Sequence, residues 1–145
     1  MARVLRRVVL DAAPLIAVLR NEPHADAVVA AIGNAPARIS TVTLAEVGDV
    51  LERLHGWRPS AIAATFEGAL GVAVDVVAPS VEVATRAGSL RARHYRRRAN
   101  AVSLGDCFVL ATAERGETVV TSDRGLARTA RLEKIDVELV PRKPS

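Results

Sequence analysis

The chain contains few of the residues that mark thiol, zinc or nucleotide-cofactor chemistry. Its 145 residues include a single cysteine, Cys107, so no internal disulfide can form, and we expect this thiol to be buried on an apolar helix. The histidines are isolated from one another and from Cys107, which is unlike a zinc site. A Gly-x-Ser-x-Gly elbow, a Walker loop and a Gly-x-Gly-x-x-Gly turn are also missing. The sequence therefore gives no support to a serine hydrolase, a thiol enzyme or a nucleotide-cofactor enzyme.

Aromatic residues and long apolar runs are scarce as well. Phe, Trp and Tyr make up 3% of the chain, so we do not expect extensive stacking of bases on an exposed sheet. The apolar stretches are strand-sized or interrupted by charge, well short of the roughly 20 residues that cross a bilayer. The first residues, Met1 to Arg7, lack the apolar run of a signal peptide. We therefore expect a cytoplasmic protein that does not contact a membrane.

Half of the residues are apolar, which is enough for one sizeable core, and short strands alternate with helices. Strands are predicted at 8–10, 39–42, 72–77, 119–121 and 137–140, and helices at 14–19, 24–32, 43–55, 59–71, from 80 through 87, and 104–113. This order predicts an α/β fold: a three-layer α/β/α sandwich with a mostly parallel central sheet of about five strands. We expect a single domain over residues 1–141 and a polar tail over 142–145.

Four acidic residues stand where a predicted strand ends or a predicted helix begins. Asp11 and Asp123 follow apolar strands, whereas Glu46 and Asp106 each come three residues after a Thr or Ser that opens a helix. The carboxyl ends of parallel strands share one edge of a sheet, so the four side chains should meet in one crevice. Because like charges raise one another's pKa and repel, such a group needs a cation, and carboxylate oxygens suit Mg²⁺ or Mn²⁺.

Each acid also has a purely structural interpretation. Thr43 with Glu46, and Ser103 with Asp106, have the spacing of capping boxes. The two strand-end acids have the positions of ordinary loop residues or of caps for the helices that follow. The structural interpretation is favoured for each acid taken alone, whereas the combination of four favours a shared site.

The net charge of the chain is +4, and one stretch without acids holds six arginines. It includes Arg93, Arg96, Arg97 and Arg98. Arginine side chains there would hold the phosphates of a nucleic-acid strand and so position it without reading much sequence. The alternative is an ordinary solvated helix end, where basic residues favour the helix dipole.

Four segments that contain the acids resemble, in order, the motifs of the PIN-domain family, especially the VapC-type toxin ribonucleases of bacterial toxin–antitoxin pairs. They are Val9-Leu10-Asp11-Ala12-Ala13-Pro14-Leu15, Thr43-Leu44-Ala45-Glu46-Val47, Ser103-Leu104-Gly105-Asp106-Cys107 and Thr121-Ser122-Asp123-Arg124-Gly125-Leu126. The resemblance spans nearly the whole chain and implies a PIN-like fold. It also implies that Asp11, Glu46, Asp106 and Asp123 are the metal-binding quartet and that Thr121 orients a metal-bound water or an acid. Gly105 departs from the pattern, since many relatives carry Ala there.

The resemblance further implies an endoribonuclease that depends on Mg²⁺ or Mn²⁺ and hydrolyses RNA phosphodiester bonds. Its implied partners are a second copy in a homodimer and a VapB-like antitoxin that covers the crevice within a larger toxin–antitoxin assembly. Two alternatives stay open: a PIN-like domain that binds RNA or a partner without cutting, and a phosphorylatable receiver domain. The receiver is disfavoured because Asp11 has no acidic neighbour and the only lysines are Lys134 and Lys143.

Overall fold

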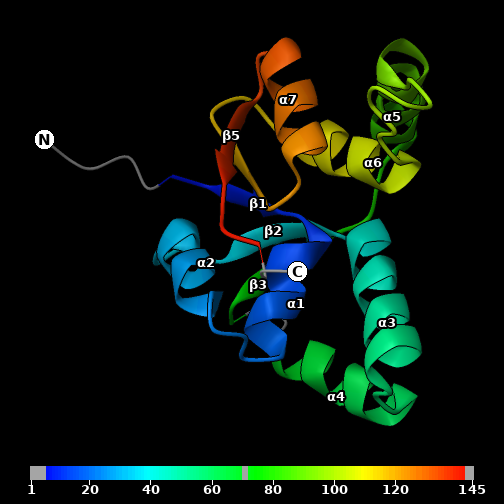
Figure 1. Ribbon diagram of the computed structural model, residues 1–145. Coiled ribbons are helices and arrows are strands. Elements are labelled where there is room, and N and C mark those ends of the chain that lie inside the picture. Colours follow the sequence, from blue (N-terminus) through cyan, green and yellow to red (C-terminus); the bar gives the residue numbers. More distant parts are fainter. Residues whose placement is uncertain (1–5, 70–71, 143–145) are drawn as a thin grey trace, which may run out of the picture.

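A computed structural model describes residues 6–69 and 72–142 of the chain (Figure 1). Its centre is a five-stranded parallel sheet with the order β3-β2-β1-β4-β5. The strands are β1 (Val8–Leu10), β2 (Ala37–Ser40), β3 (Val74–Val77), β4 (Thr118–Thr121) and β5 (Asp136–Leu139). The predicted parallel α/β sheet is therefore confirmed.

Helices cover both faces of this sheet. They are α1 (Ala12–Leu19), α2 (Ala25–Ile32), α3 (Thr41–His55), α4 (Pro59–Ala69), α5 (Val81–His94), α6 (Leu104–Thr112) and α7 (Arg124–Leu132). Figure 1 shows α1 to α4 in the lower part of the molecule and α5 to α7 in the upper part. The three predicted layers are thus present.

The two-residue period of a strand divides the buried side chains of β1 between two cores. Val8 and Leu10 belong to the core beneath α1, α2, α3 and α4, while Val9 belongs to the core beneath α5, α6 and α7. Leu15 and Ile16 of α1 are also buried in the first core, as expected of an apolar helix face. A strand that is apolar on both faces is typical of a parallel sheet covered by helices on each side.

The strand order reverses at β1 and β4. From β1 the chain proceeds outward to β2 and β3, and it then returns to place β4 and β5 on the other side of β1. Open α/β sheets bind ligands outside the carboxyl ends of the strands at such a reversal. A receiver domain has the order 2-1-3-4-5, whereas this sheet has the order 3-2-1-4-5, so the topology argues against that alternative.

One predicted boundary was wrong, and it matters for the site. The strand expected at 39–42 ends at Ser40, and α3 begins at Thr41 rather than at Thr43. The reason is the Ser40 hydroxyl, which accepts a hydrogen bond from the backbone N–H of Val42 at 3.1 Å and so caps the helix. Thr43 instead lies buried inside the helix.

Among the remaining elements, α7 was not among the predicted helices, and α5 continues to His94, seven residues beyond the predicted segment. The other boundaries differ from the prediction by a few residues. The helix from Pro59 ends by Ala69, and Gly71, its predicted end, lies outside the described residues, as do residues 143–145 of the predicted tail. Within residues 6–69 and 72–142, none of the helices combines the length and apolar character needed to span a bilayer.

Candidate active site

Asp11 lies at the end of β1 and is held by two hydrogen bonds. Its side chain is buried, with 6% of the residue exposed, and Oδ1 accepts from the backbone N–H of Ala12 at 2.8 Å. Its Oδ2 accepts from the hydroxyl of Thr121 at 2.7 Å. One carboxylate therefore caps α1 and is fixed against the neighbouring strand β4.

Thr121 connects two of the four acids. It is fully buried at the end of β4, and besides donating to Asp11 its hydroxyl oxygen accepts from the backbone N–H of Asp123 at 3.0 Å. The Asp123 side chain is turned toward α7, where its Oδ1 accepts from the N–H of Leu126 at 3.0 Å. Because β1 and β4 are adjacent, Asp11 and Asp123 flank the point where the strand order reverses.

Asp106 lies in the first turn of α6 and closes the predicted capping box. The Ser103 hydroxyl accepts from the N–H of Asp106 at 3.0 Å, and Asp106 Oδ2 accepts from the N–H of Ser103 at 2.9 Å. The structural interpretation of this acid is therefore correct, and its second carboxylate oxygen, Oδ1, is the one outside the box.

Glu46 does not close a capping box, contrary to the structural interpretation of its spacing from Thr43. It stands in the second turn of α3, half-buried, and its carboxylate lies against Gly105 at the start of α6. A β-carbon on Gly105 would overlap Oε1 of Glu46 and would lie 2.7 Å from its Cδ. Glu46 is thus free of a helix-capping role and is directed toward the segment that carries Asp106.

The acids interact through their charges. Burial raises the pKa of Asp11 to about 6, despite the hydrogen bonds from Thr121 and Ala12, and the charges of Asp106 and Asp123 add to the rise. Burial raises the pKa of Glu46 to about 7, with further contributions from Asp11 and Asp106. Burial and the charge of Asp123 also raise the pKa of Asp106. Four side chains from distant parts of the sequence therefore share one electrostatic environment.

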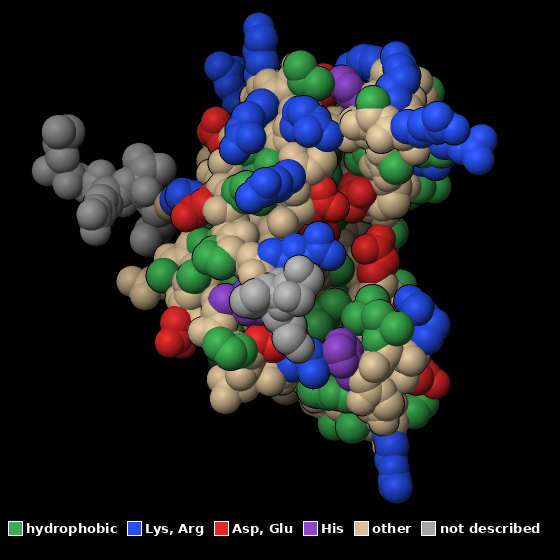
Figure 2. Space-filling model, viewed as in Figure 1, with side chains coloured by type: hydrophobic (Ala, Val, Ile, Leu, Met, Phe, Trp, Pro, Cys, Tyr) green, Lys and Arg blue, Asp and Glu red, His purple; other side chains and the backbone are tan. Residues whose placement is uncertain are grey.

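This environment is visible on the surface. Figure 2 shows acidic side chains in the hollow between the upper part of the molecule, formed by α5, α6 and α7, and the lower part that contains α3 and α4. Lys and Arg side chains cover much of the surface above it. An acidic hollow with basic surroundings suits a ligand that pairs a divalent cation with phosphate groups.

The four carboxylates are suitable ligands for a hard divalent cation, but they do not form a complete coordination shell. All four are carboxylates, and the pKa values of three of them are raised by burial first and by neighbouring carboxylates second, both of which a bound cation would offset. Yet in the part of the chain that the structure describes, no three Asp, Glu, His or Cys side chains are placed to hold one ion as they stand. Of the four acids, Glu46 is the one whose side chain is not held by a helix-capping hydrogen bond.

The arginine segment forms a tight turn that packs near the acids. After α5 ends at His94, the backbones of Arg96 and Asn100 pair through two hydrogen bonds of 2.9 Å. The arginines at the tip, Arg96, Arg97 and Arg98, are exposed in a loop that follows the end of α5. Arg93 differs, because it lies in the last turn of α5 and pairs with Glu133.

Asn100 attaches this turn to α7, a role that sequence reasoning missed. Its Nδ2 donates to the carbonyl of His94 at 3.2 Å and to the hydroxyl of Thr129 at 3.1 Å. A β-carbon on Gly125 would lie 3.1 Å from Oδ1 of Asp123 and 3.4 Å from Oδ1 of Asn100. The base of the arginine turn is therefore a close neighbour of Asp123. No motif or periodicity marked Asn100, because its partners are distant in sequence.

Cys107 has the structural role that the sequence favoured. The residue is fully buried in the core beneath α5, α6 and α7. Burial raises the pKa of its thiol to about 11, and the charge of Asp106 adds to the rise. A thiol that stays protonated is a poor nucleophile.

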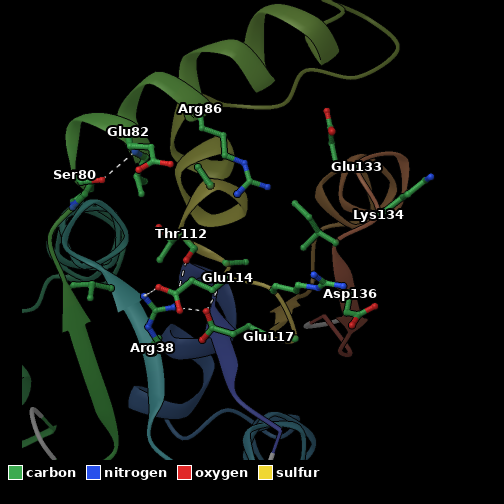
Figure 3. A pocket seen from close by; sticks show the side chains of 18 of the residues that line it. Arg38, Ser80, Glu82, Arg86, Thr112, Glu114, Glu117, Glu133, Lys134 and Asp136 are labelled. Atoms are coloured by element: carbon green, nitrogen blue, oxygen red, sulfur yellow. Dashed lines mark hydrogen bonds and ion pairs between the residues drawn. The ribbon is translucent and has the colours of Figure 1, made fainter.

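A cavity of about 800 Å³ lies away from the acids. Figure 3 shows that Arg38 of β2 and the loop residues Glu114 and Glu117 gather at one side of it, where Arg38 pairs with Glu117. Glu117 precedes β4 whereas Asp123 follows it, so the cavity lies at the other end of that strand. Its wall is mixed in charge and contains none of the four acids, which makes the acidic crevice the better candidate site.

Comparison with solved structures shows where this fold occurs. The DNA-bound VapBC complex from Salmonella typhimurium contains a chain that is 24% identical, with a TM-score of 0.70, covering 92% of this chain and 98% of that one. A chain of VapBC2 from Rickettsia felis, bound to a promoter DNA fragment, is 15% identical, with a TM-score of 0.66 and coverages of 92% and 98%. FitAcB from Neisseria gonorrhoeae gives 21% identity, a TM-score of 0.62 and coverages of 90% and 95%.

No curated protein sequence matches the chain. A model of the PIN domain family, in contrast, matches residues 8–132, a range that begins at β1, ends with α7 and contains all four acids. The chain belongs to the PIN domain family.

Proposed function

We propose that this protein is a metal-dependent endoribonuclease and the VapC-type toxin of a type II toxin–antitoxin pair. The observation that carries the proposal is the meeting of Asp11, Glu46, Asp106 and Asp123 at the reversal of strand order in a PIN-domain fold. The similarity in fold to chains of VapBC complexes supports the toxin–antitoxin part.

The quartet would hold Mg²⁺ or Mn²⁺, with Asp11 and Asp106 as the principal ligands. Glu46 and Asp123 would complete the coordination directly or through water molecules. A bound divalent ion would lower the pKa of a water molecule and neutralise charge on the scissile phosphate. The protein's own contribution is orientation: Thr121 fixes one oxygen of Asp11, and the Ser103 capping box fixes Asp106.

The exposed arginines Arg96, Arg97 and Arg98, together with Arg93, would hold the RNA backbone beside this site. Guanidinium groups bind phosphate oxygens in two-point contacts and fix the position of a strand. The turn that carries them is connected through Asn100 to α7, next to Asp123. A strand bound along the turn would therefore be led toward the carboxylates.

For the partners, we propose a homodimer and a VapB-like antitoxin that binds over the crevice within a larger toxin–antitoxin assembly. The chains with a similar fold come from complexes named as VapBC, which supports a protein partner of this kind. Purification of the protein from its native cells, followed by mass spectrometry, tests this. Recovery of the protein free of any small partner would contradict it.

The direct test of activity is cleavage of total RNA by purified wild-type protein and by Asp106→Asn protein, with Mg²⁺ or Mn²⁺ added. We expect the wild-type protein alone to cut, because asparagine keeps the shape of the side chain but removes its charge. The fragments should carry 5′-phosphate and 3′-hydroxyl ends, as hydrolysis by water gives, and not the 2′,3′-cyclic phosphate that attack by the ribose hydroxyl gives. Equal cleavage by both proteins would contradict the assignment of the site.

The competing function is a PIN-like domain that binds RNA or a partner without cutting it. Four intact carboxylates in one crevice, three of them with pKa values raised by burial and by neighbouring carboxylates, argue against this alternative, since such perturbed acids are typical of a reactive site. In the same assay it predicts RNA binding by both proteins and fragments from neither.

A further inference from the structure

Asn100, at the base of the arginine turn, has a side-chain amide whose orientation is fixed by its neighbours. The Thr129 hydroxyl donates to the carbonyl of Gly125 at 2.9 Å, so toward Asn100 it can only accept. The carbonyl of His94, the other neighbour, can only accept as well. The atom that contacts both must therefore be the amide nitrogen, Nδ2, which uses its two hydrogens there. The amide oxygen, Oδ1, is directed to the opposite side.

This oxygen is the polar atom of Asn100 that lacks a partner within residues 6–69 and 72–142. The backbone N–H and carbonyl of Asn100 pair with the backbone of Arg96 at 2.9 Å each, whereas no donor among these residues reaches Oδ1. Oδ1 is also accessible to solvent. An oriented and accessible acceptor of this kind can bind a donor from outside the chain, such as a water molecule.

The orientation of the amide places Oδ1 beside Asp123. A β-carbon on Gly125 would lie 3.4 Å from Oδ1 of Asn100 and 3.1 Å from Oδ1 of Asp123. The two oxygens therefore flank one space, which the absence of a side chain on Gly125 leaves open. The charge of Asp123 acts on both Asp11 and Asp106, so this space adjoins the acidic crevice.

We propose that Asn100 is a positioning residue of the cation site, whose amide oxygen accepts a hydrogen bond from a water molecule bound to the cation beside Asp123. The inference rests on the proposed function, in which the quartet binds a divalent cation. A water molecule on such a cation is a strong hydrogen-bond donor, and the oxygens that accept from it contribute to the affinity of the site. An amide oxygen does so without adding a fifth negative charge to the crevice.

Calorimetric titration of Mn²⁺ into wild-type and Asn100→Ala protein tests the proposal. We expect the Asn100→Ala protein to bind Mn²⁺ about three- to tenfold more weakly, the change that corresponds to one lost hydrogen bond. Because Asn100→Ala also detaches the turn from α7, Thr129→Val is the control for that effect. It removes one partner of Nδ2 while His94 still holds the amide and Oδ1 is kept, so the affinity should fall by less than about twofold.

Asn100→Asp separates the two roles of the side chain by the sign of the change. Aspartate keeps an acceptor oxygen but cannot donate to His94 or Thr129. If the oxygen serves the cation, the Asn100→Asp protein should bind Mn²⁺ more tightly than the wild-type protein, because a charged acceptor replaces a neutral one. Ala99→Asp is the control for added charge, since Ala99 is exposed and adjacent in the turn, and its effect should be clearly smaller.

A second measurement examines the Asn100 side chain directly. The chain has three asparagines, Asn21, Asn34 and Asn100, and the first two lie in turns after α1 and α2. With ¹³C-labelled asparagine, Mg²⁺ should shift the Cγ resonance of Asn100, identified by its loss in the Asn100→Ala protein, and should leave the other two in place. Circular dichroism establishes that the variants are folded.

The outcomes distinguish this inference from the proposed function. Wild-type affinity in the Asn100→Ala protein, or an Asn100 resonance that does not respond to Mg²⁺, would overturn the inference alone. Equal weakening by Asn100→Ala, Asn100→Asp and Thr129→Val would also overturn it, since Asn100 would then only attach the turn. So would equal tightening by Ala99→Asp and Asn100→Asp. Absence of Mn²⁺ binding by the wild-type protein would overturn the proposed function and, with it, this inference.

Discussion

Asp11 combines burial, hydrogen bonding and repulsion in a single side chain. Burial alone favours the neutral acid, whereas the Thr121 hydroxyl and the Ala12 N–H favour the carboxylate, and the net result is a pKa raised to about 6. The ion-free protein therefore holds a group that is partly protonated near neutral pH. Titration of Asp11 therefore reports the charge of the site without any substrate.

Stability without metal should fall as the pH rises from about 4 to about 7. The pKa values of Asp11 and Glu46 are raised on folding, to about 6 and about 7, so the folded state binds more protons than the unfolded chain in this range. Protonation of Asp11 and Glu46 stabilises the folded state fully at a pH below their pKa values in the unfolded chain. This stabilisation is lost as the pH rises through their pKa values in the folded protein. For buried Asp11 the loss is roughly 2–3 kcal/mol.

Urea unfolding of wild-type and Asp11→Asn protein at pH 4 and pH 7 measures this. The free energy of unfolding of the Asn variant minus that of the wild-type protein should be roughly 2–3 kcal/mol larger at pH 7 than at pH 4. Saturating Mn²⁺ should make the wild-type protein more stable than the Asn variant at pH 7, because only the site with a charged Asp11 is stabilised by the ion. A difference between the two proteins that does not change with pH would count against the raised pKa.

Thr121→Val should weaken the site through Asp11. The substitution keeps the shape of the side chain but removes a buried hydrogen bond to Asp11 and the acceptor for the N–H of Asp123. We expect a loss of about 1–3 kcal/mol in the free energy of unfolding and a further rise in the pKa of Asp11. Urea unfolding and NMR titration of the Asp11 carboxyl measure the two effects.

Thr112→Val is the matched control for this prediction. The Thr112 hydroxyl is also buried, but it donates to the carbonyl of Phe108 within its own helix at 2.7 Å. Its loss should affect stability and leave the pKa of Asp11 as it is. Equal pKa changes in the two variants would remove Thr121 from the positioning of this acid.

At the scale of elements, the arginine turn between α5 and α6 is the segment proposed to bind RNA, through arginines that are exposed to solvent. Replacing Arg96, Arg97 and Arg98 by Ala should weaken RNA binding and flatten its dependence on salt. For a single strand, losing three phosphate contacts lowers the slope of log affinity against log salt by roughly 2. Fluorescence anisotropy with labelled RNA at several salt concentrations measures it.

A matched triple variant removes the same charge elsewhere. Arg115, Arg131 and Lys134 are exposed and lie in the loop before β4 and at the end of α7, away from Asp123. Their replacement by Ala should leave the salt slope nearly unchanged. The same slope for both triple variants would show that the turn has no special part in binding RNA.

Elements with their own local signals were predictable from sequence. Ser103 followed by Asp106 correctly predicted the start of α6, and the β-branched run before Asp123 correctly predicted β4. The start of α3 was placed too late because Ser40 and Thr43 are both acceptable caps in sequence, and only the bond from Val42 to Ser40 decides between them. The error concealed that Glu46 has no capping role.

At the scale of the whole molecule, the parallel order of the sheet is what brings the acids together. Strand–helix alternation predicted that strand ends share an edge, and the strand order places β1 beside β4 at the reversal. The contact of Glu46 with Gly105 and the attachment of Asn100 to Thr129 could not be predicted. Both depend on packing between segments that are distant in sequence, and no local pattern encodes such packing.

The central claim is that four distant carboxylates share a divalent cation. Its most direct measurement is calorimetric titration of Mn²⁺ into the wild-type protein and into the Asp11→Asn, Glu46→Gln, Asp106→Asn and Asp123→Asn variants, each first shown to be folded. We predict saturable binding by the wild-type protein and weaker binding by every variant, with the largest losses for Asp11 and Asp106. A wild-type protein that binds no Mn²⁺, or four variants that bind it as tightly as the wild type does, would contradict the claim.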